Sequence, residues 1–183
     1  MTRRASAIVP PALLLAMAMA AGCASEAPQP ATPPAERVEA AELGLAVAAL
    51  PPGFEVVEND ARALVLSGPG ETRLRIAIGP AERAGINLVE AVKARRAEIE
   101  AAPGGVYLGN RELMTPIGTA FTARGSFERD GEAVEETVVY ALHPSANRLL
   151  TLTYAYPPGE AETRVQELIS VLGEVEGIGF PGG

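Results

Sequence analysis

The sequence predicts an α+β domain in which two or more helices cover an antiparallel sheet of about six to seven strands. Three observations support this fold class. Several segments between residues 54 and 156 alternate apolar and polar side chains, as half-buried strands do. The pair Asp130-Gly131 separates two such segments and is a strong signal for a two-residue hairpin. Segments 87–102 and 160–175 carry apolar residues at helical spacing, and this order of strands and helices is typical of α+β domains.

The first residues of the chain have the composition of an export signal. Arg3 and Arg4 precede an apolar segment over residues 8–21 that contains two Pro. This segment is too short and too rich in Ala for a membrane-spanning helix, which needs about 20 strongly apolar residues. A positive start, an apolar middle and small residues at the end form the pattern of a cleaved signal. We therefore expect residues 1–22 to be a signal peptide.

Cys23, the only Cys in the chain, directly follows Ala20-Ala21-Gly22. This arrangement resembles the signal of bacterial lipoproteins, with Ala20 where that family usually has Leu. The resemblance implies that Cys23 carries lipid, becomes the mature N-terminus and anchors the protein to a membrane. Ser25, shortly after it, is not the Asp that retains many Gram-negative lipoproteins at the inner membrane, so the resemblance favours the outer membrane, facing the periplasm. The alternative is a plain secretory signal with an incidental Cys.

A tether and a single domain follow Cys23. Residues 24–36 contain four Pro and no aliphatic side chain larger than Ala, which favours an extended, disordered linker. We therefore assign residues 23–37 to the lipidated Cys and its tether, and residues 38–176 to one domain. The mature chain has 161 residues (183 less 22), and its formal charge is about −10, because cleavage removes two Arg from a chain of charge −8. Such an acidic chain is not suited to bind nucleic acid through its net charge.

The first half of the domain is predicted from short patterns. Residues 38–50 are ambiguous, because alternating Leu and Val suit a strand whereas the Ala and Glu content suits a helix. Turn residues separate three alternating segments that we expect to be strands, at 54–58, 62–66 and 72–78. A helix over 87–102 begins at Asn87, a good capping residue, with Glu90 three positions later as in a capping box. Its apolar stripe is Leu88, Val92 and Ile99, and the basic residues expected largely off that stripe are Lys93, Arg95 and Arg96.

The second half of the domain contains the predicted hairpin. Short strands are expected at 106–108 and near Leu113. If the turn at Asp130-Gly131 is tight, Arg129 pairs with Glu132 and every later pair is fixed. The expected pairs are Phe127–Val134, Ala123–Val138 and Phe121–Tyr140 on one face, and Ser126–Glu135, Arg124–Thr137 and Thr122–Val139 on the other. A strand at 148–156, a helix at 160–175 and a flexible tail at 177–183 complete the chain.

The order of elements resembles the PsbP-like domain, including the lipoproteins similar to DcrB and to the mycobacterial LpqN group. The resemblance rests on Leu50-Pro51-Pro52-Gly53-Phe54 after the tether, on two early strands, a central helix, a long meander and a closing helix. It implies an α/β/α sandwich and, for most members, binding or assembly roles rather than catalysis. The Thr and Arg content of the second sheet face favours two layers instead, with residues 38–50 as a candidate third layer.

The sequence contains no recognisable catalytic or metal-binding motif, and we expect no cofactor and no metal site. His143 is the only histidine and falls in a hairpin loop, where a loop residue is expected rather than a member of a Ser-His-Asp triad. No Cys/His cluster suits zinc. Glu136 is anomalous, because its parity places a carboxylate on the apolar face opposite Gly125. A buried acid with a raised pKa is a functional candidate, although structural pairing is the commoner reason for such a residue.

The polar face of the sheet is the candidate binding surface. The residues of opposite parity to the aliphatic core are Arg73, Arg75, Arg124, Thr122, Thr137, Thr151 and Thr153. Thr is ordinary on a sheet surface, whereas three Arg in an acidic protein suit bidentate recognition of carboxylates or phosphates. We expect a lipid-anchored, non-catalytic envelope domain that binds or helps to assemble an envelope protein. The alternatives are a small-ligand carrier and a hydrolase that uses Glu136 or His143.

Overall fold

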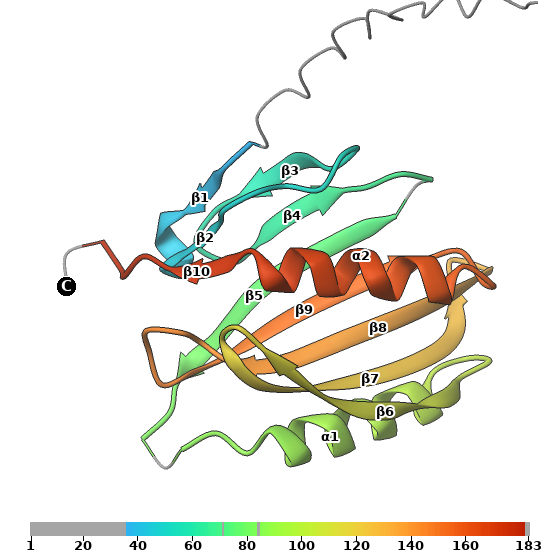
Figure 1. Cartoon of the computed structure of the whole chain (residues 1–183). Helices are drawn as coiled ribbons and strands as arrows, with labels where there is room; N and C mark the ends of the chain where they lie inside the picture. The colour runs from blue at the N-terminus through green and yellow to red at the C-terminus, as the bar shows by residue number, and fades with distance from the viewer. Residues whose placement is uncertain (1–35, 71, 84, 182–183) are drawn as a thin grey trace, which may run out of the picture. The chain divides into compact units, whose positions relative to one another are not determined.

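The computed structural model describes residues 36–70, 72–83 and 85–181, which form a layered α+β domain (Figure 1). The predicted signal peptide, Cys23 and most of the tether lie outside the described residues. The elements, in order, are β1 (Val38–Ala40), η1 (Ala41–Leu43), β2 (Leu45–Val47), β3 (Glu55–Asn59), β4 (Leu64–Ser67), β5 (Arg73–Ala81), α1 (Leu88–Ala101), β6 (Val106–Thr115), β7 (Gly118–Arg129), β8 (Glu132–Leu142), β9 (Arg148–Tyr156), α2 (Ala161–Gly173) and β10 (Val175–Gly177).

Seven of the strands form one antiparallel sheet in the order β3-β4-β5-β9-β8-β7-β6. This confirms the predicted fold class and the upper value of the expected strand number. The prediction of two short strands, at 106–108 and near Leu113, is wrong, because β6 is a single strand of 10 residues. A bulge between Tyr107 and Gly109 lets β6 bend without ending, so it remains paired with β7 as far as the turn.

The predicted hairpin is confirmed at every pair from Ala120–Ala141 to Arg129–Glu132. Asp130 has φ 55° and Gly131 has φ 83°, so both central residues of the turn adopt the positive φ that a type I′ turn requires. The twist of this turn matches the twist of the flanking strands. The register of β7 and β8 is therefore determined locally by two residues.

The larger core lies between the sheet and the layer that contains α2. Leu168, Val171 and Leu172 of α2 pack against buried strand residues such as Leu152 and Tyr154. Not every apolar residue of α2 faces this core, because Ile169 is exposed whereas Val171 is buried.

A second, three-stranded sheet of order β1-β2-β10 extends the α2 layer. The ambiguous residues 38–50 thus form two strands joined by a 3-10 turn. Strand β10 directly follows α2 and pairs with β2, as Figure 1 shows. The chain after β10 is not a free tail over residues 178–181, because Phe180 stacks on His143 with ring centroids 5.3 Å apart and Ile178 N–H donates to the carbonyl of Gly44. An aromatic side chain that covers a buried imidazole ties this segment to the domain.

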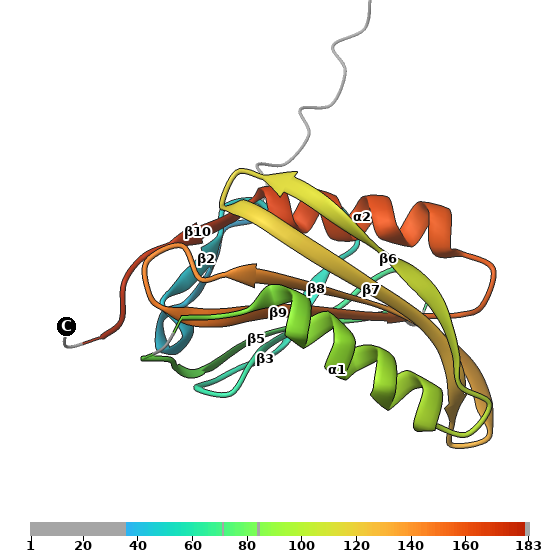
Figure 2. The same cartoon turned by 90° about the horizontal axis from the view of Figure 1, so that it is seen from below.

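Helix α1 lies on the other side of the large sheet, so the domain has three layers (Figure 2). Val92 of α1 forms a smaller core with Ala123, Val138 and Tyr140 of β7 and β8. The two-layer expectation is therefore wrong, and the α/β/α sandwich implied by the PsbP-like resemblance is correct. Asn87 caps α1 as predicted, accepting hydrogen bonds from the N–H groups of residues 89 and 90.

Replacing Gly131 with Val should lower the free energy of unfolding by about 1–3 kcal/mol, because a β-branched residue is strained at positive φ. Chemical denaturation monitored by circular dichroism measures the change. Asn tolerates the same backbone conformation, so Gly131→Asn is the control and should lose less stability. An unchanged midpoint for the Val variant would contradict the importance of this turn.

Candidate functional site

The register of the sheet separates the predicted binding residues between its two faces. Directly paired residues of adjacent strands project on the same face. One row across the sheet joins Arg73, Ala155 and Glu136, and the next joins Arg75, Thr153 and Val138. Because Val138 packs against α1, these rows lie on the α1 side of the sheet.

Arg124 lies on the opposite face. It pairs with Thr137, which pairs with Tyr154, and Tyr154 belongs to the core beneath α2. Thr122 and Thr137 share that face and are buried. The prediction of a single patch with three Arg is therefore wrong, because parity assigned within one hairpin does not carry over to strands whose pairing was unknown. Arg124 contacts Glu135 instead, with Nη2 and Oε2 3.7 Å apart.

On the α1 side of the sheet, two arginines form ion pairs with the buried side chain of Glu136. Its side chain is 3% exposed, and both carboxylate oxygens accept hydrogen bonds from arginines. Oε1 accepts from Nη2 of Arg95 on α1, and Oε2 accepts from Nη2 of Arg129 on β7 at 3.2 Å. Two guanidinium groups thus compensate a buried negative charge, which would be costly to leave unpaired.

Local structure positions the two arginines. Arg95 follows Val92 by three residues and precedes Ile99 by four, so it belongs to the buried stripe of α1 rather than lying off it. A Cβ on Gly125 would lie 2.6 Å from Ile99, so the absence of a side chain lets α1 approach the sheet beside Glu136. Phe127 supports both guanidiniums, with Arg95 and Arg129 at 5.8 and 5.2 Å from its ring centroid.

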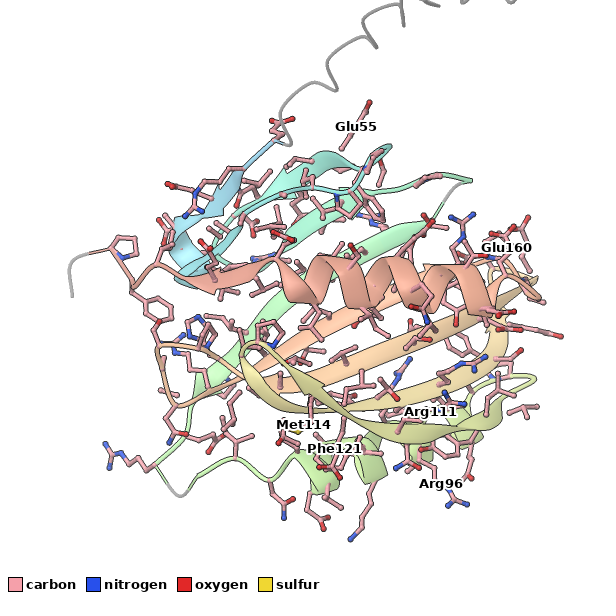
Figure 3. The ribbon with its side chains drawn as sticks, in the orientation of Figure 1. Glu55, Arg96, Arg111, Met114, Phe121 and Glu160 are labelled. Carbon is pink, nitrogen blue, oxygen red and sulfur yellow. The ribbon has the colours of Figure 1, made fainter. Side chains whose placement is uncertain are left out.

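The side of α1 that faces away from the sheet carries solvent-exposed ion pairs. Lys93 pairs with Glu90, and Arg96 pairs with Glu100, each at 2.8 Å. Arg96 projects outward in Figure 3 and leans over Tyr107 at 5.3 Å. Lys93 and Arg96 are thus off the stripe as predicted, whereas Arg95 is not. The spacing 88, 92, 95, 99 contained the signal for Arg95, since these positions repeat on one side of a helix.

Helix α1 covers only part of one face of the large sheet, and the rest of that sheet face is open to solvent. A depression of about 280 Å³ lies beside Glu136, between α1 and strands β8 and β9. Its lining residues are Arg95, Glu98, Arg129, Glu136, Val138, Tyr140, Thr151 and Thr153. Burial raises the pKa of the Tyr140 hydroxyl there to about 12, so this group stays protonated and can donate a hydrogen bond.

A second depression of about 250 Å³ adjoins the first and shares Arg129. Its lining includes Arg73 and Ala155, and Glu132 contributes an acidic side chain. Arg73 and Arg75 are exposed, and neither forms an ion pair with any residue that the structure describes. The structure therefore brings three of the four predicted binding residues (Arg73, Arg75 and Glu136) to one open face and adds Arg95 and Arg129 to them. We call this surface the arginine face.

The buried side chain of His143 forms hydrogen bonds that link two parts of the fold. Its Nε2 lies 2.9 Å from the carbonyl oxygen of Leu43, and its Nδ1 accepts a hydrogen bond from the Ser145 N–H at 3.2 Å. These bonds define a neutral imidazole that donates from Nε2. Burial lowers the pKa of His143, and the charge of Arg148 lowers it further, although the bond to Leu43 opposes this shift. His143 lies in the β8–β9 loop as predicted, but its side chain is buried and links this loop to η1.

Glu136 and His143 do not form one catalytic group. They are seven positions apart along an extended strand, which corresponds to about 23 Å. Within residues 36–181, leaving out 71 and 84, no cluster of three or more His, Cys, Asp or Glu side chains is placed to hold a metal ion. Over the same part of the chain, no helix has both the length and the apolar character needed to cross a membrane.

The architecture is that of the PsbP-like fold. Solved structures with this fold include LpqN of Mycobacterium tuberculosis, described as involved in cell envelope biogenesis (13% identity, TM-score 0.50, 78% of this chain and 84% of that one). Others are the cyanobacterial PsbP of Synechocystis sp. PCC 6803 (10%, 0.51, 78% and 92%) and the Ran-binding protein Mog1p of Saccharomyces cerevisiae (14%, 0.56, 79% and 96%). No protein-family model and no curated protein matches the sequence. The TM-scores show a shared fold, and sequence identities of 10–14% leave the roles of individual residues to be argued from the geometry.

Replacing Arg95 with Met should lower the free energy of unfolding by about 2–3 kcal/mol. Breaking a buried ion pair costs about 3–5 kcal/mol, and Arg129 continues to compensate part of the charge of Glu136. Urea denaturation measures the loss. Lys93→Met removes an exposed pair on the same helix and should change stability by less than about 0.5 kcal/mol. The double variant Arg95→Met with Glu136→Met should be more stable than the sum of the single losses, and strict additivity would contradict the pairing.

Acidification should destabilise the protein through His143. The folded-state pKa is lowered, so above the ordinary value of about 6.5 both states hold a neutral imidazole and no stability is lost. As the pH falls below about 6.5, the unfolded state takes up the proton first, and stability declines until the folded-state pKa is passed. Melting curves between pH 7 and 5 measure this decline. His143→Gln keeps a side-chain N–H but does not titrate, so its profile should be flatter, and an equal slope would contradict the assignment.

Proposed function

We propose that this protein is a lipid-anchored component of the bacterial cell envelope whose PsbP-like domain binds another envelope component without catalysis. The anchor is lipid on Cys23, the spacer is the Pro-rich segment behind it, and the binding surface is the arginine face. The observation that carries the proposal is an open, Arg-lined sheet face on a domain whose chain begins with a lipoprotein-like signal.

The fold neighbours support a binding role. Mog1p is a Ran-binding protein, and LpqN is involved in cell envelope biogenesis, so this scaffold occurs in proteins with such roles. The similarity is one of fold, and a fold alone does not define an activity. The binding role of this chain therefore depends on the residues of its own surface. An exposed arginine face with a rigid base, held by the Glu136 network, is suited to recognition.

The other two candidate functions have less support. A hydrolase needs a nucleophile and a base within hydrogen-bond reach, whereas Glu136 is occupied by two guanidiniums and both ring nitrogens of His143 contact the backbone or Ser145. A carrier of apolar ligands needs an internal cavity. One apolar pocket, beneath β1 and β2, has no room for even a water molecule. A depression of about 270 Å³ between α1 and strands β6 and β7 opens to solvent and includes the charged Lys93 and Arg96 in its lining, so it is not an internal apolar cavity either.

The decisive experiment for the anchor is Cys23→Ser, tested in bacterial cells. Metabolic labelling with an alkyne fatty acid should label the wild-type protein and not the variant, because only a thiol at this position accepts the lipid. The variant should remain uncleaved or be released from the membrane fraction, since stable anchoring needs two or more acyl chains. Separation of the two membranes on a sucrose gradient tests the expected outer-membrane location. An unmodified mature N-terminus beyond residue 23 in mass spectrometry would overturn the anchor.

A further inference from the structure

We propose that the arginine face binds an extended acidic segment of an envelope protein, with carboxylates two residues apart placed on Arg73 and Arg75. This inference rests on the proposed binding function and names the chemistry of the partner. Arg73 and Arg75 occupy alternate positions of β5, so both project from the α1 side of the sheet. Consecutive side chains on one face of a strand are about 6.6–6.8 Å apart, and an extended peptide places its own alternate side chains at the same spacing.

The surroundings leave both guanidiniums accessible. Arg73 pairs across the sheet with Ala155 and Arg75 with Thr153, so small side chains form the floor beside them. Among the described residues, Arg75 has one long bond, from Nη2 to the carbonyl of Arg62 at 3.4 Å, and both arginines lack an acidic partner. Guanidinium groups recognise carboxylates through two parallel hydrogen bonds, and that geometry is available here.

The Glu136 network fixes the position of Arg129 at the border of this face. Arg129 is half exposed and lines both depressions, while Glu136 holds its guanidinium in place. Glu98, Glu132 and Glu136 are the acidic side chains that line the two depressions. Arg95 and Arg129 compensate Glu136, and Arg95 also pairs with Glu98. Arg73 and Arg75 form no ion pair with these three carboxylates and add two positive charges to the face of a protein with net charge −8, although Glu132 lines the same depression as Arg73. Hydrogen bonds from backbone N–H groups lower the pKa of Asp60, and the charge of Arg75 helps to lower it further.

The shape of the surface favours a protein segment over a small molecule. The two depressions, of about 250 and 280 Å³, lie side by side and open to solvent, whereas small-ligand pockets of about 300–1,000 Å³ enclose most of their ligand. A chain lying along the exposed part of β5 and β9 reaches both depressions and can meet the Thr151 and Thr153 hydroxyl groups. Charge complementarity then selects an acidic segment as the occupant.

The test uses two eight-residue fluorescent peptides and the full-length protein in phosphatidylcholine nanodiscs. One peptide alternates Glu and Thr, and the other has the same composition arranged as adjacent Glu pairs separated by two Thr, so that no two Glu are two residues apart. Fluorescence anisotropy should show tighter, salt-sensitive binding of the alternating peptide. Arg73→Gln with Arg75→Gln should weaken it by about tenfold or more.

Matched controls separate this site from net charge. Arg83→Gln with Arg111→Gln removes the same charge from an exposed loop and from the opposite face of β6, and should leave binding unchanged. Equal affinity for both peptides, or an unchanged affinity in the Arg73 and Arg75 variant, would overturn the proposal. Tighter arginine-dependent binding of inorganic phosphate or of phosphatidylglycerol vesicles would overturn it in favour of a phosphate group. Arginine-dependent self-association in sedimentation would overturn it in favour of a second copy.

A photocrosslinking residue at Thr153 distinguishes failure of this inference from failure of the proposed function. In cells, crosslinks to an envelope protein that persist in the Arg73 and Arg75 variant would retain the binding function and reject the acidic segment. Absence of any crosslink from Thr153, and also from a probe at the exposed Ser170 of α2, would reject the binding function itself.

Discussion

The buried carboxylate of Glu136 is the constraint on which the α1 side of the molecule depends. A negative charge beneath a helix must be compensated, and the compensation comes from Arg95 on that helix and from Arg129 on the neighbouring strand. The same contacts that satisfy Glu136 hold α1 at one position over β7 and β8. Gly125 allows this position, because a larger residue would collide with Ile99. Electrostatic compensation and close packing thus act at the same place.

The two faces of the sheet differ because they are covered differently. On one side, α2 and the small sheet form a continuous aliphatic layer with Leu168 and Leu172 at its centre. On the other side, α1 covers part of the sheet and leaves β5 and β9 open. A sheet with one fully covered face needs little further burial for stability, so its other face can keep polar and charged side chains. The arginine face is a consequence of this asymmetry.

Rigidity is the property that links the fold to recognition. The exposed arginines stand on a strand in the interior of a seven-stranded sheet, and Arg129 is held by a buried partner. A strand backbone fixed in a sheet, and a side chain held as that of Arg129 is, lose less conformational entropy on binding than a mobile loop does. The C-terminal segment is fixed in a comparable manner, because Phe180 covers His143 and lies 4.8 Å from the guanidinium carbon of Arg148.

Local chemistry made the tight turn at Asp130-Gly131, the hairpin register and the cap of α1 predictable from the sequence, and the alternation of apolar residues did the same for the fold class. Turns and caps depend on residues close together in the chain, such as Asp130-Gly131 and Asn87, so their outcome can be read without a structure. The sequence could not show which faces of separate strands lie together, and this became clear from the strand pairing in the structure. The pairing of the strands places Arg124 and Arg73 on opposite faces of the sheet and brings Arg95 and Arg129 to Glu136. Contacts of this kind, between residues distant in sequence, depend on the register of every intervening strand.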